Sequence, residues 1–280
     1  MIREKNFLLE GEHNKPIVTD VYFQPTHQPK PIVIFCHGYK GFKDWGAWDL
    51  VAEKFAEAGF FFIKFNFSHN GGTVEEPIDF PDLDAFAQDN FTKQLDDLKT
   101  VIDWITTTKQ FHANADVQNV NLIGHSRGGG IATIKAEEES KVKKVITWNG
   151  ISDFESRFPK GKDLQKWKEN EFYFVKNGRT QQQMPHHIQF YNDFMANKER
   201  FNIQRATSNL RKPLLIIHAK DDPTVNVSEA QKLHEWNKKS ELFLVEGSNH
   251  VFETKHPWDE ERLSPDLEKV TRKTIQFIEQ

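Results

Sequence analysis

The alternation of short apolar segments with longer amphipathic ones constrains the fold of this chain more than any other feature. Continuous apolar runs such as 32–36 (IVIFC) and 214–218 (LLIIH) have the length of buried strands. Between such runs lie segments such as 90–107, in which apolar residues recur every three or four positions, as they do on one face of a helix. Buried strands that alternate with amphipathic helices are typical of a mostly parallel sheet covered by helices on both faces. The sequence therefore predicts an α/β fold.

The individual elements can be predicted from the same pattern. Two runs at 6–10 and 17–23 are separated by a turn and predict an antiparallel hairpin at the N-terminal end. The predicted strands of the main sheet are 32–36, 60–67, 120–123, 145–148, 214–218 and 242–245. The predicted helices are 48–58, 90–107, 128–138, 228–238 and 267–278.

Two stretches interrupt the alternation. The segment 68–89 contains two glycines and two prolines, and we expect a loop at the strand ends, where α/β sheets bind ligands. The segment 150–212 is too rich in aromatic residues for a linker and predicts a cap inserted into a single domain that comprises 1–280. Within it, the run 172–175 is followed by Asn177-Gly178, which predicts a small hairpin with a type I′ turn.

Composition excludes several classes of protein. The 280 residues include 37 Lys and Arg against 41 Asp and Glu, so the net charge of −4 gives no basic surface for nucleic acid. The single cysteine, Cys36, permits neither an intrachain disulfide nor a cysteine-based zinc site. No signal peptide is visible, and the apolar runs are far shorter than the about 18–20 residues that span a bilayer. We therefore expect a soluble cytoplasmic protein without a nucleic-acid or membrane partner.

The clearest chemical motif is Gly124-His125-Ser126-Arg127-Gly128, which fits the pattern G-x-S-x-G. It follows the predicted strand 120–123 and opens the predicted helix 128–138, which is the context that this motif requires. A sharp strand-to-helix turn holds the serine in a strained conformation with its hydroxyl exposed. Side chains two residues before and after it would collide, so both positions must be very small. The motif predicts Ser126 as a nucleophile.

A serine hydroxyl is a poor nucleophile without a positioned base and a carboxylate that orients the base. In this architecture the order along the chain is serine, acid, histidine. The predicted strand 214–218 leads into Asp221-Asp222-Pro223, so either aspartate could supply the acid. The predicted strand 242–245 leads into a loop that contains His250. Since all three candidates follow strand ends in the expected order, the sequence predicts a Ser-Asp-His triad.

The remaining requirement of such a site is an oxyanion hole. After the first parallel strand comes His37-Gly38-Tyr39, and an H-G turn lets a backbone N–H group point toward the serine. We expect the backbone amides of Tyr39 and Arg127 to be the two donors, each worth about 3–4 kcal/mol of transition-state stabilisation. The side chains of both residues would then be free to line the pocket.

The other histidines predict no further site. His37 and His125 lie in strand-end turns, His186 and His187 lie in the cap, and His218 is expected to pack at its strand end. Four others are predicted at the surface: His13, His27, His112 and His234. Neither an H-E-x-x-H motif nor a carboxylate–histidine cluster at helical spacing is present. We therefore expect neither a metal nor a cofactor.

Together these motifs resemble the α/β-hydrolase superfamily along essentially the whole chain. The motifs that carry the resemblance are HGYKG (37–41), FNFSHNGG (65–72), GHSRGG (124–129), HAKDDPTV (218–225) and GSNHVF (247–252). The chain is most similar to single-domain serine esterases of the cinnamoyl/feruloyl esterase, dienelactone-hydrolase-like and S9-peptidase-like group. This resemblance implies a short cap at 150–212. It also implies Ser126 as nucleophile, His250 as base and Asp222, rather than Asp221, as acid, with the Tyr39 and Arg127 amides as oxyanion hole.

One stretch departs from the pattern of these relatives. Where they often have D-F-x-G-x-G-x-S, this chain has N-F-S-H-N-G-G-T at 66–73, so its pocket wall differs. The predicted function is hydrolysis of carboxylic esters with small or aromatic acyl groups through an acyl-enzyme. A thioesterase, amidase or peptidase would use the same triad. A binding protein on the hydrolase scaffold is the alternative from another class, and a reaction with a fluorophosphonate probe at Ser126 would discriminate against it.

Overall fold

A computed structural model describes residues 1–26 and 28–280 of the chain. Of the four histidines predicted at the surface, His27 lies outside the described residues, while His112 is exposed and His13 and His234 are partly exposed. Among the described residues, no helix is both long and apolar enough to cross a membrane.

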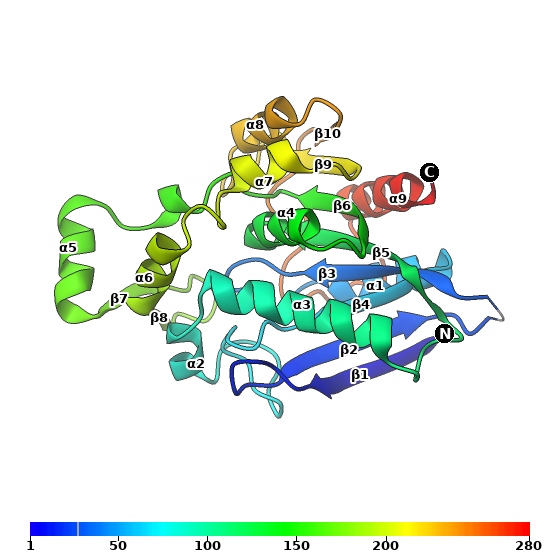
Figure 1. Cartoon of the computed structure of the whole chain (residues 1–280), viewed down its shortest axis with the longest axis horizontal. Coiled ribbons are helices and arrows are strands. Elements are labelled where there is room, and N and C mark those ends of the chain that lie inside the picture. Colours follow the sequence, from blue (N-terminus) through cyan, green and yellow to red (C-terminus); the bar gives the residue numbers. More distant parts are fainter. Residues whose placement is uncertain (27) are drawn as a thin grey trace.

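An eight-stranded sheet forms the centre of the molecule (Figure 1). Its strands are β1 (Ile2–Leu9), β2 (Ile17–Phe23), β3 (Lys30–Cys36), β4 (Phe61–Phe65), β5 (Ala115–His125), β6 (Val142–Trp148), β9 (Leu214–Ala219) and β10 (Glu241–Val245). They are ordered β1-β2-β4-β3-β5-β6-β9-β10. The β1–β2 and β2–β4 pairs are antiparallel, and all the pairs from β4 to β10 are parallel. The predicted N-terminal hairpin and parallel sheet are confirmed.

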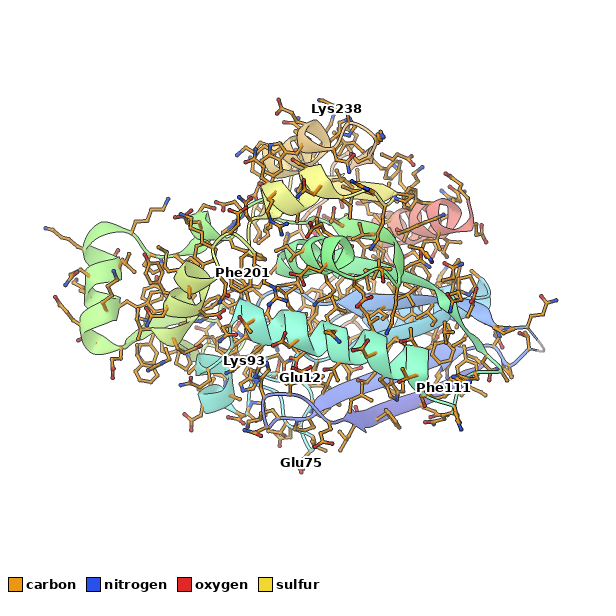
Figure 2. All side chains as sticks on the ribbon, viewed as in Figure 1. Glu12, Glu75, Lys93, Phe111, Phe201 and Lys238 are labelled. Atoms are coloured by element: carbon orange, nitrogen blue, oxygen red, sulfur yellow. The ribbon has the colours of Figure 1, made fainter. Side chains whose placement is uncertain are left out.

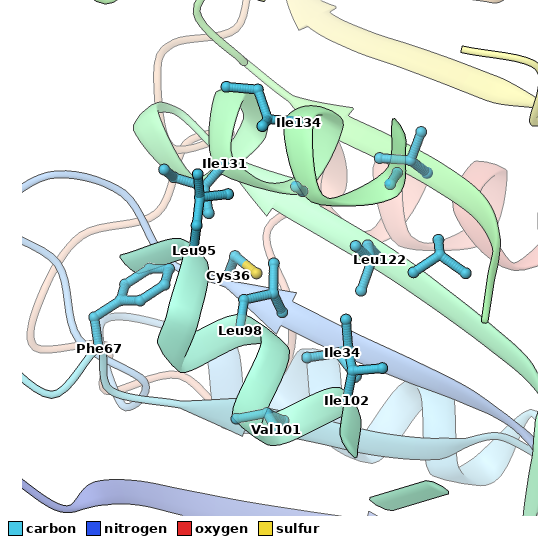
Figure 3. Close-up of a cluster of buried hydrophobic side chains, with 14 of the residues drawn as sticks. Ile34, Cys36, Phe67, Leu95, Leu98, Val101, Ile102, Leu122, Ile131 and Ile134 are labelled. Carbon is cyan, nitrogen blue, oxygen red and sulfur yellow. The ribbon is translucent and has the colours of Figure 1, made fainter. Parts of the chain in front are cut away.

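Helices cover both faces of this sheet. The main helices are α1 (Trp48–Glu57), α3 (Phe91–Thr107), α4 (Arg127–Glu138), α8 (Val227–Trp236) and α9 (Pro265–Glu279). Because side chains alternate along a strand, Ile32 and Ile34 of β3 enter one core with α3, α4 and α8, while Val33 enters the other with α1 and α9. Figure 3 shows the first core, where Leu95 and Leu98 of α3 meet Ile34 and Cys36.

The segment between β6 and β9 extends beyond one end of the sheet (Figure 1). It contains the 3₁₀ turn η1 (Glu155–Arg157), the helices α5 (Gly161–Asn170), α6 (Gln189–Ala196) and α7 (Ile203–Asn209), and the strands β7 (Phe172–Lys176) and β8 (Gln183–His187). Its buried aromatic side chains join the same core as α3, and Phe201, labelled in Figure 2, packs edge-to-face against Phe91 with ring centroids 5.6 Å apart. Most of its aromatic residues are therefore part of a continuous core.

Two predictions of local structure are wrong. The segment 68–89 is not loop throughout, because α2 (Leu83–Ala87) forms within it. The Asp82 side chain caps this helix by accepting a hydrogen bond from the Ala85 amide at 2.8 Å, and Phe86 is buried against Phe80.

The hairpin β7–β8 exists, but its turn is not type I′. The connection is six residues long, 177–182, and neither Asn177 nor Gly178 has the positive φ that a type I′ turn requires. Instead, the Asn177 side chain accepts a hydrogen bond from the Arg179 amide at 3.0 Å, and the Asn177 amide bonds to the Gln182 carbonyl at 2.8 Å. These hydrogen bonds hold a wider loop closed.

Candidate active site

Ser126 occupies the turn between β5 and α4 in a strained conformation. Its φ of 55° and ψ of −122° lie in a region that non-glycine residues rarely adopt. The Ser126 amide donates to the Trp148 carbonyl of β6 at 2.9 Å, and the Ser126 carbonyl accepts from the Gly129 amide at 3.0 Å. The backbone around the serine is thus fixed from both the sheet and the helix.

The glycines on either side of Ser126 are required by close backbone contacts. A Cβ atom on Gly124 would lie 2.2 Å from the Gly128 carbonyl oxygen. A Cβ atom on Gly128 would lie 2.4 Å from the carbonyl oxygen of Cys36 at the end of β3. Neither neighbour is a flexible side chain, so this turn can form only with glycine at both positions.

His250 and Asp222 form a close pair at the ends of neighbouring strands. Asp222 follows β9, His250 follows β10, and His250 Nδ1 lies 2.6 Å from Asp222 Oδ2. The other carboxylate oxygen accepts hydrogen bonds from the amides of Thr224 and Val225 at 2.7 and 2.9 Å. Burial would raise the pKa of Asp222, but the hydrogen bonds from His250 and these amides outweigh burial and lower it. The carboxylate is therefore held ionised against the imidazole.

Asp221 has a different position. It is exposed, and its carboxylate accepts a hydrogen bond from the Gly247 amide at 3.1 Å. Of the two aspartates that the sequence left open, the structure therefore brings only Asp222 to His250.

Ser126 and His250 line the same cavity, which has a volume of about 130 Å³. Among the described residues, their side chains form no hydrogen bond with each other, so the two groups share a cavity without direct contact. Catalytic hydrogen bonds are often long before substrate binds. The cavity is also lined by Tyr39, Trp45 and Trp48, which make much of its wall aromatic.

The turn after β3 passes directly over Ser126. A Cβ atom on Gly38 would lie 2.8 Å from Ser126 Cβ, and the turn is closed by a hydrogen bond of 3.1 Å from the Gly41 amide to the Gly38 carbonyl. Within the described chain, the backbone amides of Tyr39 and Arg127 donate no hydrogen bond. Two free donors therefore flank the serine, as an oxyanion site needs.

The other histidines around this cavity are uncharged at neutral pH. Burial lowers the pKa of His37 to about 4 and that of His125 to about 3. His218 is fully buried at the end of β9, and its Nε2 bonds to the Val225 carbonyl at 2.8 Å. These three side chains pack within the protein, as the sequence predicts.

Two residues that support the site were missed by the sequence reasoning. The buried side chain of Asn149, directly after β6, donates to the His250 carbonyl at 2.9 Å and accepts from the Ala219 amide at 2.7 Å. His125 Nε2 lies 2.8 Å from the same His250 carbonyl oxygen. Asn149 therefore ties the loop of the histidine to the strand that carries the acid. A polar residue at the end of the strand beside β5 is the only sequence signal that could have revealed it.

The segment 150–212 reaches the site through Tyr39. The Tyr39 hydroxyl lies 2.7 Å from His186 Nε2 on β8, and burial lowers the pKa of His186 to about 3. The Arg127 guanidinium lies over the Tyr39 ring, 4.2 Å from its centroid, and 3.8 Å from the Asp89 carboxylate. Burial raises the pKa of Asp89 to about 6. The aromatic and charged side chains beside Ser126 thus come from four separate parts of the chain.

One cluster of carboxylates has the spacing of a metal site. Asp20, Asp44 and Asp49 bring carboxylate oxygens within 4.8 Å of one another. However, the ammonium groups of Lys43 and Lys64 lie among them, at 2.9 and 2.8 Å from Asp20 Oδ2. A third ammonium, that of Lys5, lies 2.7 Å from the Asp49 carboxylate. Three cations thus balance the three carboxylates, and the cluster fixes the loop after β3 to β2 and β4.

Comparison with known proteins identifies the fold and the family. Residues 85–254, more than half of the chain, match a protein family described as alpha/beta hydrolase fold. No curated protein sequence matches the chain. Among solved structures, Est1E from Butyrivibrio proteoclasticus is 15% identical and superposes over 98% of both chains with a TM-score of 0.70.

Two further structures extend this likeness. Est1E with bound ferulic acid superposes over 97% of both chains, with a TM-score of 0.72 and 16% identity. A dienelactone hydrolase from Anabaena variabilis is 17% identical, covers 99% of this chain and 97% of its own, and has a TM-score of 0.65. The family match and these neighbours agree on the fold. The chain therefore belongs to the α/β-hydrolase-fold family of hydrolases.

Proposed function

We propose that the protein is a serine hydrolase that cleaves carboxylic esters, with Ser126 as nucleophile, His250 as base and Asp222 as orienting acid. The observation that carries this proposal is the Asp222–His250 pair, in which the two side chains lie 2.6 Å apart. His250 lines the same cavity as Ser126, a serine held at a positive φ. Strain at a non-glycine residue persists only where the surrounding structure enforces it, and such positions cluster at functional sites.

In the proposed reaction, Ser126 Oγ attacks the carbonyl carbon of the ester while His250 Nε2 takes its proton. The tetrahedral oxyanion accepts hydrogen bonds from the Tyr39 and Arg127 amides, each worth about 3–4 kcal/mol. The alcohol leaves with the proton from His250, and the acyl group remains on Ser126. A water molecule then attacks the acyl-enzyme, gives its proton to His250, and releases the carboxylic acid and the free serine.

The aromatic wall of the cavity supports small or aromatic acyl groups. Tyr39, Trp45 and Trp48 line it, and its volume of about 130 Å³ suits a group of a few carbon atoms or one ring. A structural neighbour was solved with bound ferulic acid. We further propose that the segment 150–212 acts as a cap, since β8 touches Tyr39 through His186.

The test is hydrolysis of p-nitrophenyl acetate, butyrate and octanoate and of methyl ferulate by wild type and Ser126→Ala. We expect Ser126→Ala to fold normally and to lose turnover by roughly 10³-fold or more. Ser228→Ala, at an exposed serine on α8, is the matched control and should keep full activity. Turnover by Ser126→Ala at the wild-type rate would overturn the proposal.

A fluorophosphonate probe separates an enzyme with an unusual substrate from a binding protein. Wild type should be labelled at Ser126 even if none of these esters is hydrolysed, whereas Ser126→Ala should not be labelled. Comparison of each ester with the thioester and amide of the same acyl group then ranks the three kinds of bond. A higher rate on the amide would replace the esterase assignment with an amidase or peptidase.

A further inference from the structure

The proposed active site contains an ammonium group that contacts an aromatic ring but has no anionic partner among the described residues. Lys40 lines the cavity next to Ser126 and His250, and its ammonium lies 5.2 Å from the Tyr39 ring centroid. Among the described residues, the Lys40 ammonium takes part in no ion pair and no hydrogen bond. The formal charge that acts on it is that of the Arg127 guanidinium, which is also positive.

The rest of the cavity lining does not compensate this charge. None of the residues that line the cavity carries a carboxylate. Asp222 is shielded behind His250, and Asp89 faces Arg127 at 3.8 Å. Burial and the charge of Arg127 lower the pKa of Lys40, which means that the free site destabilises the ammonium. An anion in the cavity would relieve this cost.

The backbone of Lys40 is strained. Its φ of 53° is left-handed, where a residue with a Cβ atom is uncommon. The hydrogen bond between Gly41 and Gly38 closes the turn around it at 3.1 Å. An exposed loop could relax such a residue, but this turn also carries the Tyr39 amide beside Ser126. The turn therefore keeps Lys40, which is partly buried, at the wall of the cavity.

We propose that Lys40 binds a carboxylate on the substrate, so that the enzyme prefers esters that carry a negative charge beside an apolar or aromatic body. The aromatic side chains of Tyr39, Trp45 and Trp48 would hold the body, and the ammonium would hold the carboxylate. This inference rests on the proposed ester hydrolysis and adds the substrate class. Lys40 would act on specificity and not on the chemical step.

The experiment compares two pairs of esters that differ in charge and little in shape. Mono-p-nitrophenyl adipate and p-nitrophenyl hexanoate differ at the end of the acyl chain, whereas 4-acetoxybenzoate and its methyl ester differ on the alcohol part. We expect wild type to favour the anionic member of at least one pair in kcat/KM by about tenfold, the value of one charge-assisted hydrogen bond. The favoured pair shows on which side of the ester the carboxylate lies.

Lys40→Met should abolish this preference, and Lys40→Glu should reverse it. Lys255→Met, at an exposed lysine outside the cavity, is the matched control and should keep the wild-type ratio. Equal kcat/KM for both members of both pairs in wild type would overturn the inference while leaving the esterase proposal intact. So would a preference that Lys40→Met does not change.

A binding measurement keeps the inference testable even if none of these esters is hydrolysed. Calorimetric titration with 4-hydroxybenzoate and with its methyl ester should show tighter binding of the anion to wild type. Lys40→Met should remove that difference and Lys255→Met should not. Equal binding of both compounds to wild type would overturn the inference independently of any turnover.

Discussion

The Tyr39 hydroxyl and His186 Nε2, 147 residues apart in the chain, form a hydrogen bond of 2.7 Å that joins the turn over Ser126 to strand β8. His186 is buried and its pKa is lowered to about 3, so the imidazole is neutral at physiological pH. The Arg127 guanidinium also contacts the Tyr39 ring, 4.2 Å from its centroid. Any movement of the segment 150–212 that displaces β8 would therefore also displace Tyr39, whose backbone amide is a proposed oxyanion donor.

This contact predicts a coupled effect of two substitutions. Tyr39→Phe removes the hydroxyl but keeps the ring, and His186→Phe removes the acceptor. Since a neutral hydrogen bond is worth about 1 kcal/mol, each should lower kcat about fivefold with little change in KM. The double variant should be no worse than either single variant, because both remove the same interaction.

Steady-state kinetics of this double-mutant cycle measures the coupling. His187→Phe, one residue further along β8, is the matched control for a change of histidine to phenylalanine. Additive losses in the double variant would mean that Tyr39 and His186 act separately. A similar loss in His187→Phe would mean that the effect comes from disturbance of the strand.

A second prediction concerns the two aspartates after β9. Asn at position 222 can still accept the amides of Thr224 and Val225, but its NH₂ group would face His250 Nδ1 and favour the wrong tautomer. We expect Asp222→Asn to lower kcat/KM by about 10³–10⁴-fold. Asp221→Asn should cost less than about tenfold, because its carboxylate only bonds the Gly247 amide at the surface. The reverse ranking in ester hydrolysis would contradict the assigned acid.

The sequence predicted those features of the fold that leave a local pattern. The apolar positions of 90–107 follow helical spacing, and Phe91, Leu95, Leu98, Val101, Ile102 and Ile105 are all buried in α3. The glycines at 124 and 128 were expected from the steric demands of the serine turn, and the backbone contacts there explain both. Three candidate residues at strand ends were enough to predict the site region, because parallel strands end at one edge of a sheet.

The features that sequence reasoning missed depend on contacts between distant segments. Asn149 acts through the His250 carbonyl, 101 residues away, and no spacing along the chain records this contact. The helix α2 was missed because it is only five residues long and depends on Asp82 as cap. The turn after Asn177 was misread because a side-chain hydrogen bond to Arg179 competes with the type I′ geometry.

A third prediction tests the close contact under the serine turn. Gly128→Ala would force a methyl group against the Cys36 and His37 carbonyls, 2.4 and 2.5 Å from the new carbon atom. Because both neighbours are backbone atoms of β3 and its turn, we expect a loss of about 3 kcal/mol or more in the free energy of unfolding. Gly178→Ala, where nothing lies within 4 Å, should change it by less than about 1 kcal/mol. Urea denaturation measures both, and equal stabilities would contradict the packing argument.

The last prediction concerns the pH dependence of stability. Asp97 on α3 is buried, and burial raises its pKa to about 7 although the Ser68 amide donates to its carboxylate at 2.7 Å. The unfolded pKa is about 3.9, so between about pH 4 and 7 the folded protein binds more protons than the unfolded chain at this residue. Stability contributed by Asp97 is therefore present at low pH and is lost as the pH rises to about 7.

Asp97→Asn removes this titration. The free energy of unfolding of Asp97→Asn minus that of wild type should increase with pH from about 4 to 7 and become constant above about 7.

Asp103→Asn on the same helix is the matched control. The Lys141 and Lys99 ammonium groups hold the pKa of Asp103 below its ordinary value despite the opposing effect of burial, so its titration ends below about pH 4. Its difference curve should therefore be flat between about pH 5 and 8. Urea denaturation at each pH measures both curves, and a flat curve for Asp97→Asn would show that the carboxyl group is already ionised in the folded protein at acidic pH.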